Sequence, residues 1–407
     1  MFVNTFWSLV PPIVAIGLAL LTKETYSSLF IGIVVGALLA TDFSPIGALD
    51  TIINDGLTAA IADNAGIFLF LVILGVMVAL VNATGGSAAF GRWAASHIHS
   101  KAGALLATFA LGVLIFIDDY FNCLTVGSVM TPVTDSQRIS RVKLAYLIDA
   151  TAAPICMIAP ISSWAAAVSG VAAKLDTGVS GIQLFIEAIP YNFYSLLTIV
   201  FVITMVVLGV DYGPMAAAEL KAAQTGDLGA LSEEQEEGSS RANMWDMLIP
   251  IILLIIFCVI GLIYVGGFWD PETNAGDFIA AFGDTDAFVG LPWGALIALV
   301  LSIIYLCARR VITFKGAMGC MTKGFNAMVP AILILTFAVS LKSMTGLLGA
   351  ADYVEGLMKQ ASEGLFMLLP AIIFVVACLL AFATGTSWGT FGILIPIVLP
   401  IFNAAPD

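Results

Sequence analysis

Long apolar runs constrain this chain more than any other feature. They occur near residues 6–22, 28–41, 66–82, 143–173, 193–210, 247–266, 290–307 and 327–345. A bilayer core needs about 20 apolar residues of helix to cross it, and lipid leaves no partner for an open backbone. Charged residues make up 11% of the chain, against roughly 25% in soluble domains. We therefore expect an all-α polytopic membrane protein.

The positions of Lys and Arg predict which connections lie on the cytoplasmic side of the membrane. Basic residues gather in three connections, 83–102, 136–143 and 308–326. Two other connections hold acids and no base, 42–65 and 267–289. Because short cytoplasmic loops are rich in Lys and Arg, we expect the basic connections to be cytoplasmic and the acidic ones external. Both ends of the region 103–135 then lie on the cytoplasmic side, which predicts a helical hairpin with its tip near 118–122.

The chain also resembles itself. Four ordered matches pair Trp7–Pro11 with Trp245–Pro250, Ser28–Ala40 with Phe288–Ala298, Asn64–Gly85 with Asn326–Gly346, and Asp118–Asn122 with Phe382–Thr390. Chance similarity among apolar helices is the alternative. An odd number of spans separates the halves, so we expect two inverted-topology repeats whose broken helices or helical hairpins meet near the midplane, as in secondary transporters. The boundaries are 1–210 for the first repeat, 211–244 for an acidic and flexible cytoplasmic linker, and 245–407 for the second.

Two adjacent carboxylates, Asp118 and Asp119, interrupt the first hairpin between uncharged arms. One Asp at a bilayer centre costs about 2.5–3.5 kcal/mol, so the pair predicts a role in ion binding. Neighbouring like charges and burial both raise a carboxyl pKa toward neutrality, which favours proton exchange. Asn122, Thr125 and Ser128 add oxygen atoms that suit Na⁺, so we predict a sodium site at Asp118, Asp119 and Asn122. The alternative is that one Asp only caps a helix at the turn.

Further polar residues follow in the next apolar run. Asp149 lies six residues into it, before Pro154 and Pro160, with Ser162 and Ser163 beyond. An acid on a broken helix suggests a second part of an ion or substrate site. Two alternatives stay open: Asp149 forms a salt bridge with Arg141 or Lys143, and the serines serve helix packing.

The region 365–402 is a second pair of apolar arms around a polar centre, which we expect to form a second hairpin. This polar centre is dense in hydroxyls and glycines. The predicted site residues there are Thr384, Gly385, Thr386, Ser387 and Thr390. Glycine lets a backbone unwind and approach a ligand closely, although tight packing would explain the glycines as well. We expect these residues to line one polar cavity with Asp119, within about 10–15 Å, the span of a small-ligand pocket.

Several classes of function are excluded or disfavoured. The formal charge of −13 disfavours nucleic-acid binding, which needs a basic face. No phosphate-binding loop, metal-ligand cluster or Ser/His/Asp set occurs, so we expect neither an enzyme nor an ATP-driven pump, and no cofactor apart from Na⁺ and H⁺ as coupling ions. The six cysteines show no CxxC spacing and are typical of buried apolar side chains.

Four motifs carry a family resemblance. Phe116–Pro132, followed by Ile139–Asp149 and Ala153–Trp164, resembles the NhaC-type sodium/proton antiporters of the ion-transporter superfamily, and Thr386–Thr390 matches them as well. The resemblance covers essentially the whole chain and implies sodium/proton exchange. Relatives include a malate/lactate exchanger and amino-acid carriers. Such proteins usually continue after the second hairpin with a GDxxSPISDT-like stretch, so we expect a chain truncated at Asp407.

The sequence thus predicts a secondary transporter in a bacterial cytoplasmic membrane that exchanges Na⁺ for H⁺. The alternative is Na⁺- or H⁺-coupled transport of an amino acid or small carboxylate, while a channel is disfavoured by the paired halves. Expected partners are membrane lipid and small ions, and no nucleic acid. The transported substrate, the stoichiometry and the oligomeric state stay open, with a homodimer as one alternative.

Overall fold

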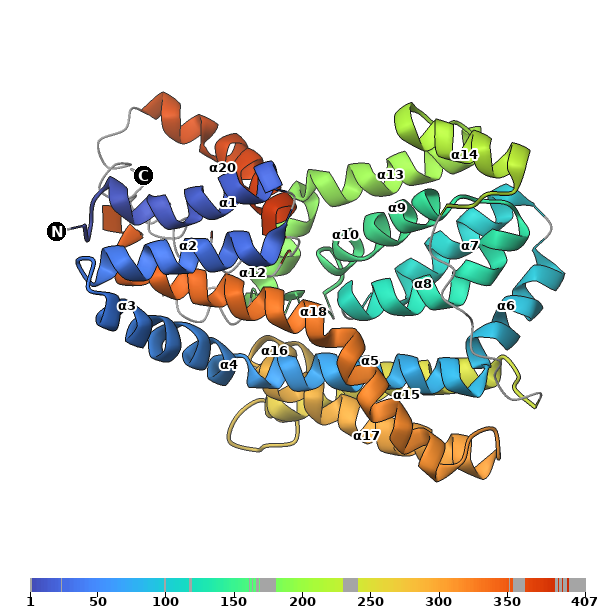
Figure 1. Cartoon of the computed structure of the whole chain (residues 1–407). Helices are drawn as coiled ribbons and strands as arrows, with labels where there is room; N and C mark the ends of the chain where they lie inside the picture. The colour runs from blue at the N-terminus through green and yellow to red at the C-terminus, as the bar shows by residue number, and fades with distance from the viewer. Residues whose placement is uncertain are drawn as a thin grey trace. The chain divides into compact units, whose positions relative to one another are not determined.

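A computed structural model gives the fold of the chain (Figure 1). It describes residues 2–350 apart from 23, 99, 117–118, 161, 163, 166–167, 169–180 and 230–240, and beyond them 352–353, 363–384, 387, 390 and 394. The described residues form helices and no strand. The expectation of an all-α polytopic membrane protein is confirmed, whereas the inverted repeat stays a prediction.

The chain divides into two compact units. Unit 1 comprises Met1–Ala65 and Val329–Asp407, and unit 2 comprises Gly66–Met328. These units are defined by internal contacts, whereas the proposed repeat is a property of the sequence. The boundaries at 210 and 245 therefore stay predictions.

Unit 1 is built around two neighbouring helices. Its elements are η1 (Phe6–Leu9), α1 (Val10–Thr22), α2 (Thr25–Ala40), α3 (Pro45–Thr51), the π-helical η2 (Ile52–Thr58), α4 (Ala59–Asp63), the part of α18 (Phe314–Leu347) from Val329 on, and α20 (Glu363–Thr384). The Glu24 carboxylate accepts hydrogen bonds from two main-chain N–H groups and caps α2. The core joins Ala15, Ile33 and Ala37 with Leu341 and Met344 of α18.

Unit 2 holds the longer helices. Its elements are α5 (Ala65–Thr84), α6 (Gly86–His97), α7 (Lys101–Leu114), α8 (Asp119–Ser136), α9 (Arg141–Thr151), α10 (Ala153–Cys156), α12 (Gly181–Ala188), η3 (Ile189–Tyr191), α13 (Phe193–Leu208), α14 (Gly213–Thr225), α15 (Trp245–Val265), α16 (Phe278–Gly283), α17 (Ala287–Ala308) and the start of α18. Helices α7, α8 and α9 contact one another, and α13 lies against α7 and α9. Helices α7 and α8 are consecutive in the chain and contact each other, as the predicted hairpin requires.

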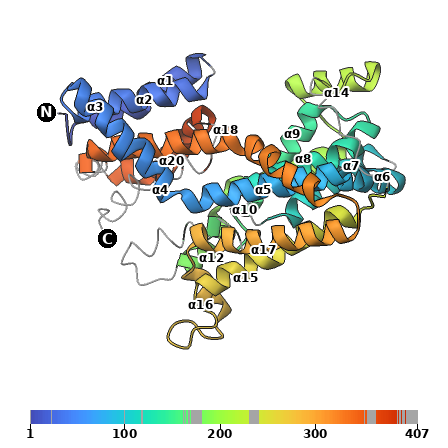
Figure 2. The ribbon, with the colours of Figure 1, turned by 60° about the horizontal axis from the view of Figure 1, so that its bottom comes forward.

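Helices α15 and α17 form the most extensive pair of unit 2 and run side by side in both ribbon views (Figures 1 and 2). They approach closely at glycines. A Cβ atom added at Gly294 would lie 2.6 Å from the Cα atom of Cys258, nearer than real Cβ atoms come. Glycine at such positions lets two helix backbones touch, which is a common way of packing helices in lipid.

Four helices in the described part of the chain are long and apolar enough to cross a bilayer. They are α5, α13 taken together with α14, α15 and α17, and the two parts of α18 would add a fifth if they form one broken span. Helices α1, α2, α7 and the apolar part of α20 are shorter. These lengths agree with a polytopic protein whose other membrane segments are broken or tilted.

Three segments differ from the sequence interpretation. The acidic connection 42–65 contains the helical run α3–η2–α4, whose apolar side includes the buried Ala48, Ile52 and Ala60. The expected linker 211–244 begins with α14, so this part is ordered. The run 143–173 is no single helix, because α9 ends before Pro154, which lacks the N–H that a continuous helix would need there.

Candidate ion-binding site

Three helix ends meet inside unit 2. Helix α7 ends at Leu114, α8 begins at Asp119, and α9 stops at Thr151, where Ala152 has a ψ of −89° and breaks the helix. The ends of α7 and α9 touch at Gly112, where an added Cβ atom would clash with the Thr151 side chain. The end of α7 therefore lies beside the broken end of α9.

One face of α8 carries three of the predicted site residues. Asp119, Asn122 and Thr125 are spaced at i, i+3 and i+6, which keeps them on the same side of a helix. Their exposed fractions are 7%, 0% and 4%, so all three side chains face the interior of unit 2. Asp119 stands in the first turn of α8, where the partial positive charge of a helix N-terminus favours a carboxylate.

Asn122 connects the three helix ends. Its Nδ2 atom donates to the main-chain carbonyl oxygens of Gly112 at 2.6 Å and Ile115 at 2.8 Å, and lies 3.5 Å from that of Thr151. Its Oδ1 atom is buried and has no hydrogen-bond partner in the described structure. An amide side chain thus holds the hairpin tip against the break in α9.

A narrow pocket lies along the same face of α8. Thr125 and Val129 of α8, Met77 and neighbouring residues of α5, and Pro250 and Ile251 of α15 line it. Apart from the Thr125 hydroxyl its walls are apolar. The polar face of α8 therefore continues into an apolar space bordered by α5 and α15.

The residues predicted around the α9 break have different positions. Ser162 is buried, donates to the Cys156 carbonyl at 2.7 Å and accepts from the Ala165 N–H at 3.2 Å, so its hydroxyl stabilises the local turn. Asp149 lies on the exposed side of α9, away from the face that packs on α7 and α8. The alternative partners of Asp149 are taken, because Arg141 pairs with Asp135 and Lys143 with Asp211.

The remaining predicted residues cannot be joined to this site. Asp118, Ser163, Gly385 and Thr386 lie outside the described residues. Ser128 belongs to α8 and Thr384 ends α20, while Ser387 is half-buried and Thr390 is buried. A cavity shared by Asp119 and Thr386 stays a prediction.

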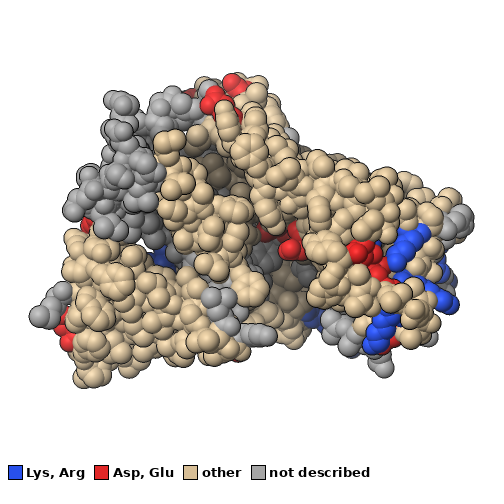
Figure 3. Space-filling view, turned by 90° about the horizontal axis from the view of Figure 1, so that it is seen from above, with Lys and Arg blue, Asp and Glu red and all other residues tan. Residues whose placement is uncertain are grey.

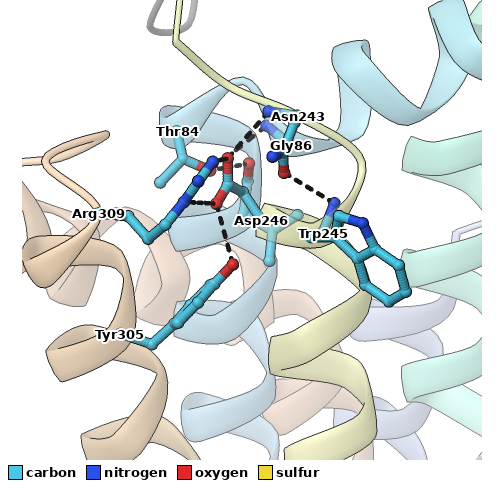
Figure 4. Close-up of polar contacts among 8 residues, drawn as sticks. Thr84, Gly86, Asn243, Trp245, Asp246, Tyr305 and Arg309 are labelled. Carbon is cyan, nitrogen blue, oxygen red and sulfur yellow. Dashed lines mark hydrogen bonds and ion pairs between the residues drawn. The ribbon is translucent and has the colours of Figure 1, made fainter.

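A buried acid that the sequence analysis missed is Asp246, at the start of α15. Its carboxylate is fully buried and accepts from the Arg309 guanidinium at 3.1 and 3.2 Å, from the Tyr305 hydroxyl at 3.3 Å and from the Asn243 N–H at 2.9 Å (Figure 4). We call these four residues the Asp246 cluster. It joins the start of α15 to the end of α17. An acid at the first residues of an apolar run was the available signal, but its partner lies 63 positions away.

A second charged cluster lies where α14 docks. Glu219 of α14 is buried, pairs with Lys101 at the start of α7, and accepts from the Ser140 N–H at 2.7 Å, just before α9. Blue and red atoms gather at this end of unit 2 in Figure 3. Lys143, also buried, pairs with Asp211 at 2.7 Å.

Comparison with known proteins places the chain. The family model described as "Na+/H+ antiporter family" matches residues 155–405. The chain belongs to this family. An uncharacterized protein of Haemophilus influenzae (strain ATCC 51907 / DSM 11121 / KW20 / Rd) is 33% identical over 422 aligned positions, covering 100% of this chain and 79% of that protein. No solved structure matches the chain.

Membership of this family establishes what kind of protein the chain is. The chain is a multi-pass membrane protein that exchanges Na⁺ for H⁺, and its family is one of transporters. The matched region begins in α10, so the hairpin α7–α8 precedes it. A buried carboxylate, an amide and a hydroxyl on one helix face, next to the carbonyl ends of two helices, supply donors that suit a small hard cation and a group that can hold a proton.

Proposed function

We propose that the antiporter is of the NhaC type, works in the cytoplasmic membrane, and uses Asp119 as the group that Na⁺ and H⁺ occupy in turn. The observation that carries this proposal is the burial of Asp119 at the hairpin tip, on the helix face that also holds Asn122 and Thr125. The resemblance of the segment Phe116–Pro132 to NhaC-type antiporters supports the subtype.

A single carboxylate couples two ions by exclusion. With a proton bound it is neutral and attracts Na⁺ poorly, and with Na⁺ bound its pKa falls because the cation favours the charged form. If the site opens to one side of the membrane at a time, each turnover moves one ion type in each direction. Asp118 stands next to Asp119 in the sequence and is the natural second carboxylate of this proposal.

Transport in proteoliposomes tests the proposal. Vesicles loaded at acidic pH with purified protein should lose their pH gradient when NaCl is added outside, and should keep it when choline chloride is added. Addition of amino acids and small carboxylates should leave the Na⁺-driven flux unchanged. Flux that requires one of those organic solutes would replace the proposal with coupled solute transport.

A further inference from the structure

The surroundings of Asn122 contain an excess of acceptors. We call the main-chain carbonyl oxygens of Gly112, Ile115 and Thr151 the carbonyl cluster; all three surround the same amide nitrogen. An amide nitrogen carries only two hydrogens, so three oxygens exceed what it can satisfy. The third contact, at 3.5 Å, is correspondingly long.

The same side chain has an acceptor without a donor. Asn122 Oδ1 is buried and no described group donates to it. A buried polar atom left without a hydrogen bond costs about 1–3 kcal/mol. Turning the amide over would not help, because Oδ1 would then face three carbonyl oxygens. Neither orientation of Asn122 satisfies the site.

The electrostatics of the cluster favour a cation. The last ladder bond of α7 among the described residues runs from the Ile115 N–H to the Leu111 carbonyl, so the Gly112 and Ile115 carbonyls lie at the free end of that ladder. Thr151 closes α9. Two helix C-termini, each with partial negative charge, therefore point their carbonyls at one buried point. Carbonyl ends of interrupted membrane helices are typical ligands of Na⁺.

From this geometry we infer that the carbonyl cluster is a binding site for a partly dehydrated monovalent cation, with the Asn122 amide as a built-in competitor. In the described state the Nδ2 group occupies the position of the cation. When the cation enters, the amide turns away from the three carbonyl oxygens. This inference rests on the proposed function for the identity of the ion, which is Na⁺.

A built-in competitor suits a transporter. Conduction and transport require that an ion bind firmly enough to enter and weakly enough to leave. The hydrogen bonds of the amide to the cluster must be broken on binding and re-form on release, which keeps the affinity moderate.

Removal of the competitor is the test. Purified protein in detergent is titrated with NaCl against choline chloride at constant ionic strength, and the melting temperature is followed, because a ligand that binds only the folded state stabilises it by RT ln(1 + [L]/Kd). The midpoint of the titration is the Na⁺ concentration that equals the Kd fitted to this relation. In Asn122→Ala the sodium-free protein should melt lower than wild type. Its Na⁺ titration should have a midpoint about tenfold lower, the factor that about 1.4 kcal/mol produces.

Two further variants complete the series. Asn122→Ser keeps one donor and should give a midpoint between those of wild type and Asn122→Ala, and it decides the matter if the alanine variant does not fold. Asn54→Ala changes an exposed Asn that donates to Asp50 and should titrate like wild type. A midpoint that is unchanged or higher in both Asn122 variants overturns the inference, since Asn122 is then only a helix cap or only a ligand.

The proposed function is judged separately. If the wild-type protein exchanges Na⁺ for H⁺ in proteoliposomes but the Na⁺ midpoints of the variants are unchanged, the competitor role of Asn122 is refuted and the proposed antiport function stands. Tighter Na⁺ binding in the variants without wild-type exchange would keep the cation site and remove the proposed transport.

Discussion

Two regions of unit 2 differ in how their buried polar groups are paired. At the junction of α7, α8 and α9 the helices end inside the protein, and one amide ties three carbonyls together while its own oxygen lacks a partner. In the α15–α17 pair the helices run without interruption, and the Asp246 cluster gives its buried carboxylate four hydrogen bonds. The first region is polar and incompletely satisfied, whereas the second is closed.

We interpret this difference as one between residues that act in transport and residues that support the fold. A buried group without its full complement of partners is costly, and we propose that an ion completes the set at the junction. A buried charge with complete partners holds elements in place, and removing one partner mainly costs stability. Changes at the junction should therefore affect transport, and changes in the α15–α17 pair should affect folding.

The largest expected effect is on Asp119. Asp119→Asn should lower Na⁺-driven proton flux in proteoliposomes by at least about 100-fold, equivalent to about 2.7 kcal/mol, because the amide neither carries a proton nor offers a charge. The amount of folded protein in the membrane should stay near that of wild type, since Asn also suits the start of a helix. Asp50→Asn, an exposed acid of α3, is the control. Flux near the wild-type value in Asp119→Asn would reduce this residue to a structural role.

Asp246 should show the opposite pattern. Asp246→Ala leaves the Tyr305 hydroxyl and the Arg309 guanidinium without their acceptor, and should lower the free energy of unfolding by about 2–3 kcal/mol. The estimate is reduced because the Arg309 side chain is 38% exposed and can turn to water. Thermal melting in detergent measures the loss, and flux per folded molecule should be preserved. A variant that melts like wild type but does not transport would move Asp246 into the transport machinery.

The close approach of α15 and α17 gives a third test. Gly294→Ala places a methyl group against the Phe257–Cys258 backbone and should cost about 1–3 kcal/mol, as overpacking does. Gly319→Ala in α18 is the matched control, because nothing lies within 4 Å of its added Cβ atom; Ala there should be neutral or gain up to about 1 kcal/mol. Equal melting temperatures for the two variants would show that the α15–α17 contact is loose.

The smallest effect concerns the docking of α14. Glu219→Gln keeps an acceptor for the Ser140 N–H but loses the charge that pairs with Lys101, and should cost about 0.5–1 kcal/mol because Lys101 is 41% exposed. Thermal melting in detergent at neutral pH measures the loss. Asp227→Asn, in the exposed pair with Lys221, should melt like wild type.

Much of the fold follows from local sequence patterns. The apolar runs gave the positions of most long helices, and side chains such as Ser100, Ser140 and Asn192 cap helices where the runs begin. The two polar breaks around Asp119 and Pro154 pointed to the junction, because only a few residue types interrupt an apolar run. The burial of Asp119, Asn122 and Thr125 agrees with their spacing on one helix face.

The remaining features were missed either because a local signal was overlooked or because they depend on contacts between residues far apart in the sequence. Asp149 was chosen for its depth in a run, but it shares the exposed face of α9 with Val142 and Ala145; the i, i+3, i+7 spacing carried that information. Helix α14 was interpreted as part of a flexible linker because of its charge, although its Ala-rich sequence favours a helix. Asp246 and Arg309 are 63 positions apart, and a pairing over such a distance is set by how α15 and α17 pack.

The carbonyl cluster also determines what a screen of amino-acid substitutions can detect. Its oxygen atoms belong to the peptide backbone. Any amino acid at positions 115 and 151 therefore supplies the same carbonyl oxygen, provided that it can adopt the same backbone conformation. A saturation screen of single substitutions would register these two positions only through side-chain packing, while Asn122 and Gly112 would respond to nearly every replacement. Relatives with different side chains around the junction can therefore keep the same three carbonyl oxygens, so divergence there need not remove the proposed cation site.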